Sequence, residues 1–407
     1  MNFDDTPEEA AFRLKARQWL DANALLRSAS RGGAADDEAS SLAEARAFQA
    51  KKAEAGYAAI TWPKDLGGMG GTSIQHLIFG QEQSRYRVSS NFFSVGLGMC
   101  IPTVMKFGSD AHRERYVRPA LSGQEIWCQL FSEPAGGSDV AAARTLAVRQ
   151  GDGWVVNGQK IWTSGAHYSD FGILLARTDV AAPKHKGLTM FIVDMRSPGV
   201  EIRPIRQMTG GSDFNEVFFS DVRIPEADRL GQPGEGWKVA LTTLMHERLS
   251  VGGTFGGFLG WRDLLNAARE NTIAGRPAAE DGRIRERIAD SWVVETGKRL
   301  LGYRAQTALS RGQTPGPEQS ILKLLTTAKP QENAYVVLDL LGEGGAVRQG
   351  ELGSTWRKIE HSWSFGAALR IAGGTDEILR NIIAERVLGL PQDIRLDKDA
   401  PFNSLTN

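Results

Sequence analysis

The spacing of apolar residues changes twice along the chain. In the first part, Phe12, Leu14, Trp19 and Leu20 supply the apolar face that is typical of an amphipathic helix. This helix has a strong start signal in residues 6–9, where Thr6 is a cap, proline occupies the first position and a glutamate can reach back to the cap. Similar patterns, separated by glycine-rich turns, predict further helices at 41–55, 73–86, 89–106 and 110–121.

From Glu125 the apolar runs become short and rich in β-branched or aromatic residues, which predicts strands. We expect a type I′ hairpin turn at Asn157-Gly158, because both residues tolerate the positive φ values that this turn requires. Gly151-Asp152-Gly153 marks another turn. The runs bounded by Pro or Gly lie at 171–177, 188–194, 200–206 and 215–220.

Long helical patterns return after Gly236, at 237–270, 283–311, 317–341, 352–372 and 375–388. The order of elements predicts a multi-domain α+β protein. Its expected parts are an N-terminal all-α domain (1–124), a middle β-barrel or β-sandwich domain (125–236), a C-terminal α domain resembling a four-helix bundle (237–391) and a frayed tail (392–407).

Composition narrows the possible functions. The 407 residues include 48 Lys+Arg and 48 Asp+Glu, and this zero net charge argues against a nucleic-acid-binding protein. Two cysteines and six scattered histidines predict neither a disulfide framework nor a metal site. The acidic start and the lack of an apolar run of about 18 residues predict a soluble protein. We expect a reducing, cytoplasmic setting.

One carboxylate interrupts an apolar stripe on the helix that follows Gly236. Burial of Glu247 in such a stripe raises its pKa towards the range of a general base that works near neutral pH. The alternative is a structural glutamate paired with an arginine, and the neighbouring Arg248 is compatible with either interpretation. The stripe consists of Ala240, Leu244, Glu247, Val251 and Phe255.

Four further segments have the composition of ligand-binding loops. Residues 129–140 run from an apolar stretch into a Pro/Gly/Ser loop, and 160–165 combine an indole with two hydroxyls. Residues 373–375 precede a helix, where free amides favour anions, and the glycines of 341–345 permit close backbone approach. The ordinary alternatives are a tight turn, a core tryptophan, a threonine cap and an interhelical loop.

Three motifs, in this order and spacing, resemble those of the acyl-CoA dehydrogenase family of flavoproteins. They are Phe-Ser-Glu-Pro-Ala-Gly-Gly-Ser-Asp-Val at 131–140, Asn-Gly-Gln-Lys-Ile-Trp-Thr-Ser at 157–164, and the segment 373–386, which begins Gly-Gly-Thr-Asp-Glu-Ile. The α, β, α order is also that of the family. The resemblance implies FAD as cofactor and covers essentially the whole chain.

The resemblance also implies roles for individual residues. The FAD-binding positions would be Gln129, Phe131, Ser132, Trp162, Thr163, Ser164, Thr375 and Glu377, and those reaching the FAD of a neighbouring subunit would be Arg269, Asp339, Gly342 and Glu343. The positions that contact the acyl-CoA substrate would be Ser138, Met245, Arg248 and Gly374. Asp339 stands where the family usually has glutamine.

The chain departs from many family members at the catalytic base. Those members carry a glutamate immediately before the Gly-Thr of the third motif, where this chain has Gly373. The isovaleryl and long-chain branches instead carry a Glu-Arg pair on the first helix of the C-terminal domain, and here that pair is Glu247-Arg248. The resemblance and the apolar stripe therefore indicate the same base.

The implied reaction is α,β-dehydrogenation of an acyl-CoA thioester to the trans-2-enoyl-CoA, as in lipid catabolism. Glu247 takes the α-proton, the flavin takes the β-hydrogen as hydride, and an electron-transfer flavoprotein removes the electrons. Glycine pairs at 252–253 and 256–257 either leave room for a bulky, branched or steroid-derived acyl chain or allow close helix packing. The expected assembly is a homotetramer, a dimer of dimers.

Two other functions stay open from the sequence. The first is a flavin oxidase or monooxygenase on the same fold, which would use O2 in place of an electron-transfer protein. The second is a half-site subunit of a heteromeric dehydrogenase, which would complete the FAD site of its partner. Gly373 and Asp339 are the features that favour the second function.

Overall fold

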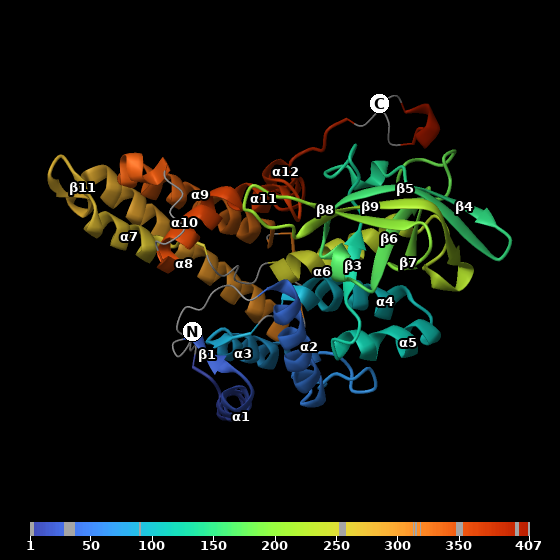
Figure 1. Ribbon diagram of the computed structural model, residues 1–407, viewed down its shortest axis with the longest axis horizontal. Helices are drawn as coiled ribbons and strands as arrows, with labels where there is room; N and C mark the ends of the chain where they lie inside the picture. Colours follow the sequence, from blue (N-terminus) through green and yellow to red (C-terminus); the bar gives the residue numbers. More distant parts are fainter. Residues whose placement is uncertain are drawn as a thin grey trace. The chain divides into compact units, whose positions relative to one another are not determined.

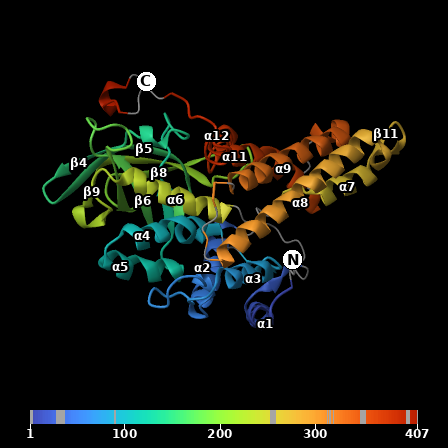
Figure 2. The same cartoon turned by 180° about the vertical axis from the view of Figure 1, so that it is seen from behind.

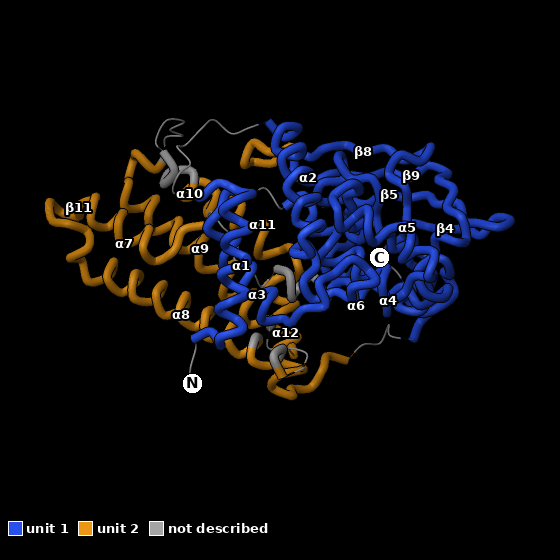
Figure 3. Tube along the Cα trace, turned by 90° about the horizontal axis from the view of Figure 1, so that it is seen from below, with its two compact units in different colours: residues 1–205, 212–247, 395–407 blue, residues 206–211, 248–394 orange. Residues whose placement is uncertain are grey.

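The computed structural model describes residues 4–27, 37–88, 91–251, 258–311, 313, 316–317, 319–346, 353–394 and 399–405. It divides into two compact units, shown in Figure 3. Unit 1 comprises 1–205, 212–247 and 395–407, and unit 2 comprises 206–211 and 248–394. This two-way division differs from the three domains expected above, whose boundaries stay a prediction.

The N-terminal helices of unit 1 follow the apolar pattern closely. The predicted cap at Thr6 is confirmed, since its hydroxyl accepts the Glu9 amide proton at 3.3 Å and the Glu9 carboxylate accepts that of Thr6 at 2.7 Å. A short pair of strands, which the pattern missed, joins β1 (Leu25–Leu26) to β2 (Tyr86–Arg87). The helices are α1 (Pro7–Asn23), α2 (Glu38–Glu54), α3 (Ser73–Gln83), α4 (Ile101–Phe107) and α5 (Asp110–Leu121).

An eight-stranded sheet forms the other part of unit 1. Its strand order is β10-β7-β6-β4-β5-β9-β8, with β3 pairing in parallel beside β6. The expected strands at 171–177 and 188–194 coincide with β6 and β7. The strands are β3 (Trp127–Leu130), β4 (Leu146–Gln150), β5 (Gly153–Ser164), β6 (Phe171–Arg177), β7 (Leu188–Asp194), β8 (Val200–Ile205), β9 (Phe214–Pro225) and β10 (Arg229–Leu230).

Two cores lie on opposite faces of this sheet. Successive side chains of a strand point to opposite faces, so Ile173 and Leu175 of β6 join one core while Leu174 and Ala176 join the other. The first core also takes in buried residues of α4, α5 and α6 (Gly236–Val251). Figures 1 and 2 both place α4 and α5 along one side of the sheet. Both faces of β6 are therefore covered, which explains its uninterrupted apolar sequence.

The prediction of a hairpin turn at Asn157-Gly158 is wrong. Both residues lie inside β5, and the turn between β4 and β5 is instead at Gly151-Asp152. The Asn157 side chain exchanges two hydrogen bonds of 2.9 Å with Asp221, which has φ +52° at an irregularity in β9. Glycine is required at 158 because a Cβ atom there would lie 2.7 Å from the Thr145 Cα. Close strand approach, not a turn, therefore accounts for this Asn-Gly pair.

Unit 2 is a helical assembly around α9, which contacts α7, α8, α10, α11 and α12. In Figures 1 and 2, α7, α8 and α9 lie side by side. The pattern at 352–372 is divided into two helices, and a short β11 (Thr272–Ile273) and β12 (Arg276–Pro277) pair follows α7. The helices are α7 (Trp261–Glu270), α8 (Gly282–Ser310), α9 (Gln319–Leu341), α10 (Gly353–Ser364), α11 (Gly366–Ile371) and α12 (Asp376–Arg386).

Together these elements confirm the predicted fold class, helical at both ends of the chain and β in the middle. The pattern at 237–270 contains α6 and α7, and the residues between 251 and 258 lie outside those described. Within the described ranges, the structure contains no helix of the length and apolar character needed to cross a bilayer.

Candidate functional site

The structure brings the first two motifs together in unit 1. The loop that leaves β3 runs beside β5, and the amide of Ile161 donates to the carbonyl oxygen of Ser132 at 2.9 Å. The Lys160 Nζ atom donates to the carbonyl oxygen of Phe131 at 3.0 Å. Residues 129–132 and 160–164, which the sequence links only through the resemblance, therefore form one continuous surface of backbone and side chains.

A buried ion pair fixes this arrangement. Lys160 is fully buried and its Nζ atom lies 2.8 Å from Glu133 Oε1. The Glu133 carboxylate also accepts the amide protons of Arg144 and Thr145 at 2.7 and 2.9 Å. Burial opposes its ionisation, but Lys160 and these amides outweigh that effect and lower the pKa of Glu133. Burial lowers the pKa of Lys160, with Glu133 acting in the opposite direction.

A β-bulge turns Trp162 out of the strand. Lys160 pairs with Val217 and Thr163 pairs with Asn215, so β5 carries one more residue than β9 across this interval. Trp162 has φ +60°, a conformation that is unfavourable for a bulky residue and costs about 1–3 kcal/mol. Its indole is 57% exposed and contacts Phe214 edge to face. The bulge therefore presents a flat aromatic surface at the residue after Ile161, whose amide bonds the Ser132 carbonyl oxygen.

Two polar side chains of these segments are buried with an unused hydrogen-bonding group. Within the part of the chain that the structure describes, Gln129 Nε2 and Thr163 Oγ1 have no hydrogen-bond partner. A buried donor without a partner costs about 1–3 kcal/mol, so native proteins rarely tolerate it away from a ligand or water. The Thr163 backbone, in contrast, is held firmly, because Asn215 Nδ2 donates to its carbonyl oxygen at 3.0 Å.

Phe131 is buried in the first core, and the remaining predicted residues of unit 1 are more accessible. Ser132 is half-buried, whereas Ser138 and Ser164 are exposed. Asp139, next to Ser138, forms a 2.8 Å ion pair with Lys184. On α6, Met245 is 49% exposed. These side chains are available to a ligand but do not by themselves define its position.

The predicted stripe on α6 is partly described. Ala240 is fully buried and Leu244 packs against the same core. The helix continues to Val251, so the first four stripe positions lie on it, and Phe255 lies outside the described residues. The side chains of Glu247 and Arg248 lie outside the described residues. The role of Glu247 therefore stays a prediction supported by the helix that carries it.

The third motif lies in unit 2, at the start of α12. The Thr375 hydroxyl accepts the amide proton of Ile378 at 3.2 Å, which is the ordinary N-cap bond. Gly373 and Gly374 have φ values of +66° and +95°, which favour glycine. Buried Asp376 bonds Arg370 through Oδ2 at 2.7 Å, while its Oδ1 has no partner among the described residues. The helix itself thus satisfies the threonine at this motif.

The other predicted residues of unit 2 are exposed or carry a backbone role. Arg269, Asp339, Gly342, Glu343 and Glu377 are all exposed. The pKa of Glu377 is lowered by its own backbone amide and then by the Thr375 hydroxyl. The carbonyl oxygen of Gly374 accepts a 2.7 Å hydrogen bond from Lys323 Nζ.

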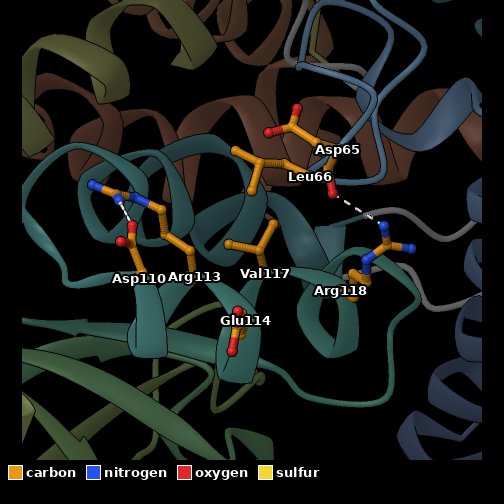
Figure 4. A pocket seen from close by; sticks show the side chains of 7 residues that line it. All are labelled: Asp65, Leu66, Asp110, Arg113, Glu114, Val117 and Arg118. Atoms are coloured by element: carbon orange, nitrogen blue, oxygen red, sulfur yellow. Dashed lines mark hydrogen bonds and ion pairs between the residues drawn. The ribbon is translucent and has the colours of Figure 1, made fainter.

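Each unit also has a surface hollow. The hollow in unit 2 has a volume of about 670 Å³, and Asp339 is among its lining residues. Lys329 and Asp290 also line it, with the Lys329 Nζ atom 2.6 Å from the Asp290 carboxylate. Figure 4 shows the other, of about 500 Å³ in unit 1. Asp110 and Arg113 pair with each other there, and Arg118 donates to the Asp65 carbonyl oxygen at 3.0 Å. The predicted flavin residues of unit 1 do not line this second hollow.

Comparison with known proteins decides the family. Models of the N-terminal, middle and C-terminal domains of acyl-CoA dehydrogenase match residues 6–124, 128–222 and 234–388. Acyl-CoA dehydrogenase IpdE1 of Mycolicibacterium smegmatis is 36% identical over 405 residues, or 95% of this chain and 99% of that protein. The chain belongs to the acyl-CoA dehydrogenase family. It is therefore a member of a family of FAD-binding oxidoreductases.

Solved structures of the family agree with this assignment. The ChsE4-ChsE5 complex of Mycobacterium tuberculosis has a chain that is 29% identical, with a TM-score of 0.76 over 97% of this chain and 100% of that one. A protein described as the Tcur3481-Tcur3483 steroid ACAD is 26% identical, with a TM-score of 0.76 and the same coverage.

The residues of unit 1 fit the FAD of an acyl-CoA dehydrogenase. An isoalloxazine ring offers a flat face for the exposed indole of Trp162 and polar edge atoms for hydrogen bonds. The unused Thr163 Oγ1 of the second motif, and Gln129 Nε2 two residues before the first, could supply such bonds. These two unsatisfied buried groups are the structural observation that favours a flavin here.

Glu133 and Lys160 of this acyl-CoA dehydrogenase had no predicted role. A signal for Lys160 was present: Trp154 and Val156 face the core, and the two-residue period of a strand places Lys160 on the same face. A lysine there needs a buried partner. The bulge at Trp162 had no such signal, because it depends on how β5 pairs with β9.

Proposed function

We propose that this acyl-CoA dehydrogenase family member oxidises an acyl-CoA thioester to the trans-2-enoyl-CoA, with Glu247 as the base. The observation that carries the proposal is the meeting of the two flavin motifs in unit 1, with Gln129 and Thr163 unsatisfied and Trp162 turned outwards. The proposal for the base rests on α6, which carries Glu247, and on the lack of a side chain at Gly373.

In this proposal the chain supplies binding, orientation and a proton acceptor. Glu247 removes the α-proton of the thioester, breaking the α C–H bond and forming an O–H bond on its carboxyl group. FAD, when bound, would supply the acceptor for the β-hydrogen and its electron pair. Gln129 and Thr163 would orient the cofactor by hydrogen bonds, and Trp162 would pack against its ring. Ser138 and Arg248 hold the CoA part of the substrate.

The test of the base is the variant Glu247→Gln. We expect it to bind FAD as the wild type does, because the predicted flavin contacts are elsewhere, and to lose at least about 1,000-fold in the rate of flavin bleaching by acyl-CoA under anaerobic conditions. Glu235→Gln is the matched control, since Glu235 precedes the same helix and bonds Lys238 and the Gln232 amide. Bleaching of Glu247→Gln at the wild-type rate would remove Glu247 from this role.

The substrate class follows from one relative. We propose a bulky, steroid-derived or branched acyl chain, because a similar chain is described as a steroid ACAD. The glycine pairs at 252–253 and 256–257, which the sequence analysis connected with this idea, lie outside the described residues. Titration of the wild type with bulky and short straight acyl-CoAs tests the idea, and bleaching by short straight chains alone contradicts it.

Assembly and acceptor belong to the same proposal. We expect an oligomer. Large apolar side chains are exposed on α8, which supports a subunit interface there. They are Trp292, Val293 and Leu300. An electron-transfer flavoprotein is the proposed electron acceptor. A cytoplasmic location agrees with Cys100 and Cys128, which are buried free thiols.

One observation favours a second candidate function, that of a half-site subunit in a heteromeric dehydrogenase. A similar solved chain comes from a structure described as a complex of two proteins, ChsE4 and ChsE5. Purification of this chain alone distinguishes the two functions. A yellow protein that bleaches with acyl-CoA supports the complete enzyme, and a colourless chain that gains flavin only with a partner supports the half-site.

A further inference from the structure

The end of the chain is docked on unit 1 next to the first motif. Of the tail expected at 392–407, residues 399–405 lie against the loop that follows β6. The amides of Phe402 and Asn403 donate to the carbonyl oxygens of Ala182 and Val180, each at 3.0 Å. Pro401 forms a β-bridge with Pro183. One β-bridge and two backbone hydrogen bonds thus attach the segment to the loop, and its residues Phe402–Ser404 form a single 3-10 turn.

The aromatic ring of this segment covers a buried charge. The Phe402 ring centroid lies 3.8 Å from the guanidinium carbon of Arg177, within the range of a cation–π interaction. Arg177 is 1% exposed, and burial lowers its pKa to about 10. Among the described residues, the hydrogen bonds of its guanidinium all end on backbone carbonyl oxygens. The ring therefore adds a favourable electrostatic contact to a cation whose hydrogen bonds end on carbonyl oxygens and whose charge is also stabilised by Glu133, Asp179 and Asp139.

Arg177 connects the docked segment to the loop after Ser138. Its guanidinium donates to the carbonyl oxygens of Ala141 at 2.6 Å and Ala143 at 3.2 Å, and on the other side to that of Lys184 at 2.7 Å. Lys184 in turn forms its ion pair with Asp139, the neighbour of Ser138. Two bonded routes thus run from Arg177 to the two ends of the stretch 139–143.

We propose that Phe402 is a positioning residue for the substrate-binding loop around Ser138 and Asp139. The ring holds Arg177 against the Ala141 and Ala143 carbonyl oxygens, and the docked backbone holds the loop that carries Lys184. Loss of the ring lets water reach the guanidinium, which weakens its hold on both carbonyls. The loop then samples more conformations, and CoA has to order it on binding. This inference rests on the proposed function, since it takes Ser138 as a CoA contact.

Phe402→Ala tests the proposal, with Phe402→Trp retaining an aromatic face. Asn403→Ala is the matched control, because its backbone amide still reaches Val180. The probe is coenzyme A itself, titrated calorimetrically into the FAD-loaded protein. We expect Phe402→Ala to weaken CoA binding about fivefold, Phe402→Trp to restore most of it, and Asn403→Ala to leave it unchanged. The amount of bound FAD should stay the same in all three.

A second measurement follows the loop directly. Hydrogen exchange of the amides of 139–145 should be faster in Phe402→Ala than in the wild type, and near the wild-type rate in Phe402→Trp. Unchanged CoA affinity in Phe402→Ala overturns the proposal, whether or not the exchange changes. A wild-type protein that binds no CoA contradicts the proposed function. In that case, unchanged amide exchange in Phe402→Ala separately overturns the inference that the ring orders the loop.

Discussion

Two segments that carry predicted FAD-binding residues, one in each unit, obtain their geometry in different ways. On β5 of unit 1, strand register, a bulge and a buried ion pair fix the backbone, while the Thr163 hydroxyl is left without a described partner. At the start of α12 in unit 2, the Thr375 hydroxyl is already occupied by the N-cap bond to Ile378. The threonine hydroxyl of the sheet segment is therefore unused, whereas that of the helix start is already used, and the atom without a described partner there is Asp376 Oδ1.

The largest effect should come from breaking the ion pair beneath the sheet segment. Lys160→Met leaves Glu133 buried without its cation, and the loss of one partner of a buried pair costs about 3–5 kcal/mol in the free energy of unfolding. The same change removes the bond to the Phe131 carbonyl oxygen, so we expect FAD to be lost as well. Urea unfolding monitored by circular dichroism, together with flavin absorbance of the purified protein, measures both effects.

The double variant Lys160→Met with Glu133→Gln is the control for this prediction. It removes the buried charge while an amide oxygen can still accept one of the amide protons of Arg144 and Thr145. We expect it to recover about half of the lost stability, because an uncharged buried group has a smaller desolvation cost. A single variant Lys160→Met as stable as the wild type would show that the pair does not hold the two motifs together.

An intermediate effect is expected from Thr163→Val, which removes the unused hydroxyl with little change in shape. The apoprotein should be as stable as before or slightly more so, because a buried group without a partner has been removed. FAD affinity should fall about tenfold, as expected for the loss of one hydrogen bond in a buried site. Thr145→Val is the matched control, since buried Thr145 donates to the Gln159 carbonyl oxygen.

The two valine variants should differ in which property falls. Thr145→Val should lower stability and leave FAD affinity unchanged. Thr163→Val should lower FAD affinity and leave stability the same or slightly higher. Fluorescence titration of each apoprotein with FAD and thermal unfolding of each apoprotein provide the two numbers. Equal FAD affinity in Thr163→Val and the wild type would mean that the unused hydroxyl does not mark a flavin contact.

The same contrast explains how much could be predicted from the sequence. Sequence patterns within one segment were sufficient to predict the Thr6 capping box and the strands β6 and β7, because neighbouring residues of the same segment determine these conformations. The predicted hairpin turn at Asn157-Gly158 is wrong because contacts with Thr145 and Asp221 of neighbouring segments determine the conformation of these residues. Non-local pairing overrode a local turn preference there.

For the candidate site, the residue roles stay predictions, and the contacts that hold the predicted residues in place were mostly not predictable from the sequence. The two flavin motifs followed from resemblance, and the strand period gave a signal that Lys160 faces the core. The positive φ of Trp162 depends on the register of β5 against β9, which alternation along one strand does not encode. The docking of Phe402 on Arg177 joins positions 225 residues apart (402 − 177), and nothing in the local pattern of either segment indicates it.

The smallest effect should come from the helix side of the comparison. Thr375→Ala removes the N-cap bond and should cost about 1 kcal/mol of stability, which Thr375→Ser should restore. FAD affinity should fall only about two- to threefold, because the free backbone amides at the start of α12 remain available to a phosphate. Denaturant unfolding and FAD titration of both variants measure these effects. A larger loss of FAD in Thr375→Ala than in Thr163→Val would reverse the comparison, because it would make the helix start, and not the sheet segment, the stronger hold on the cofactor.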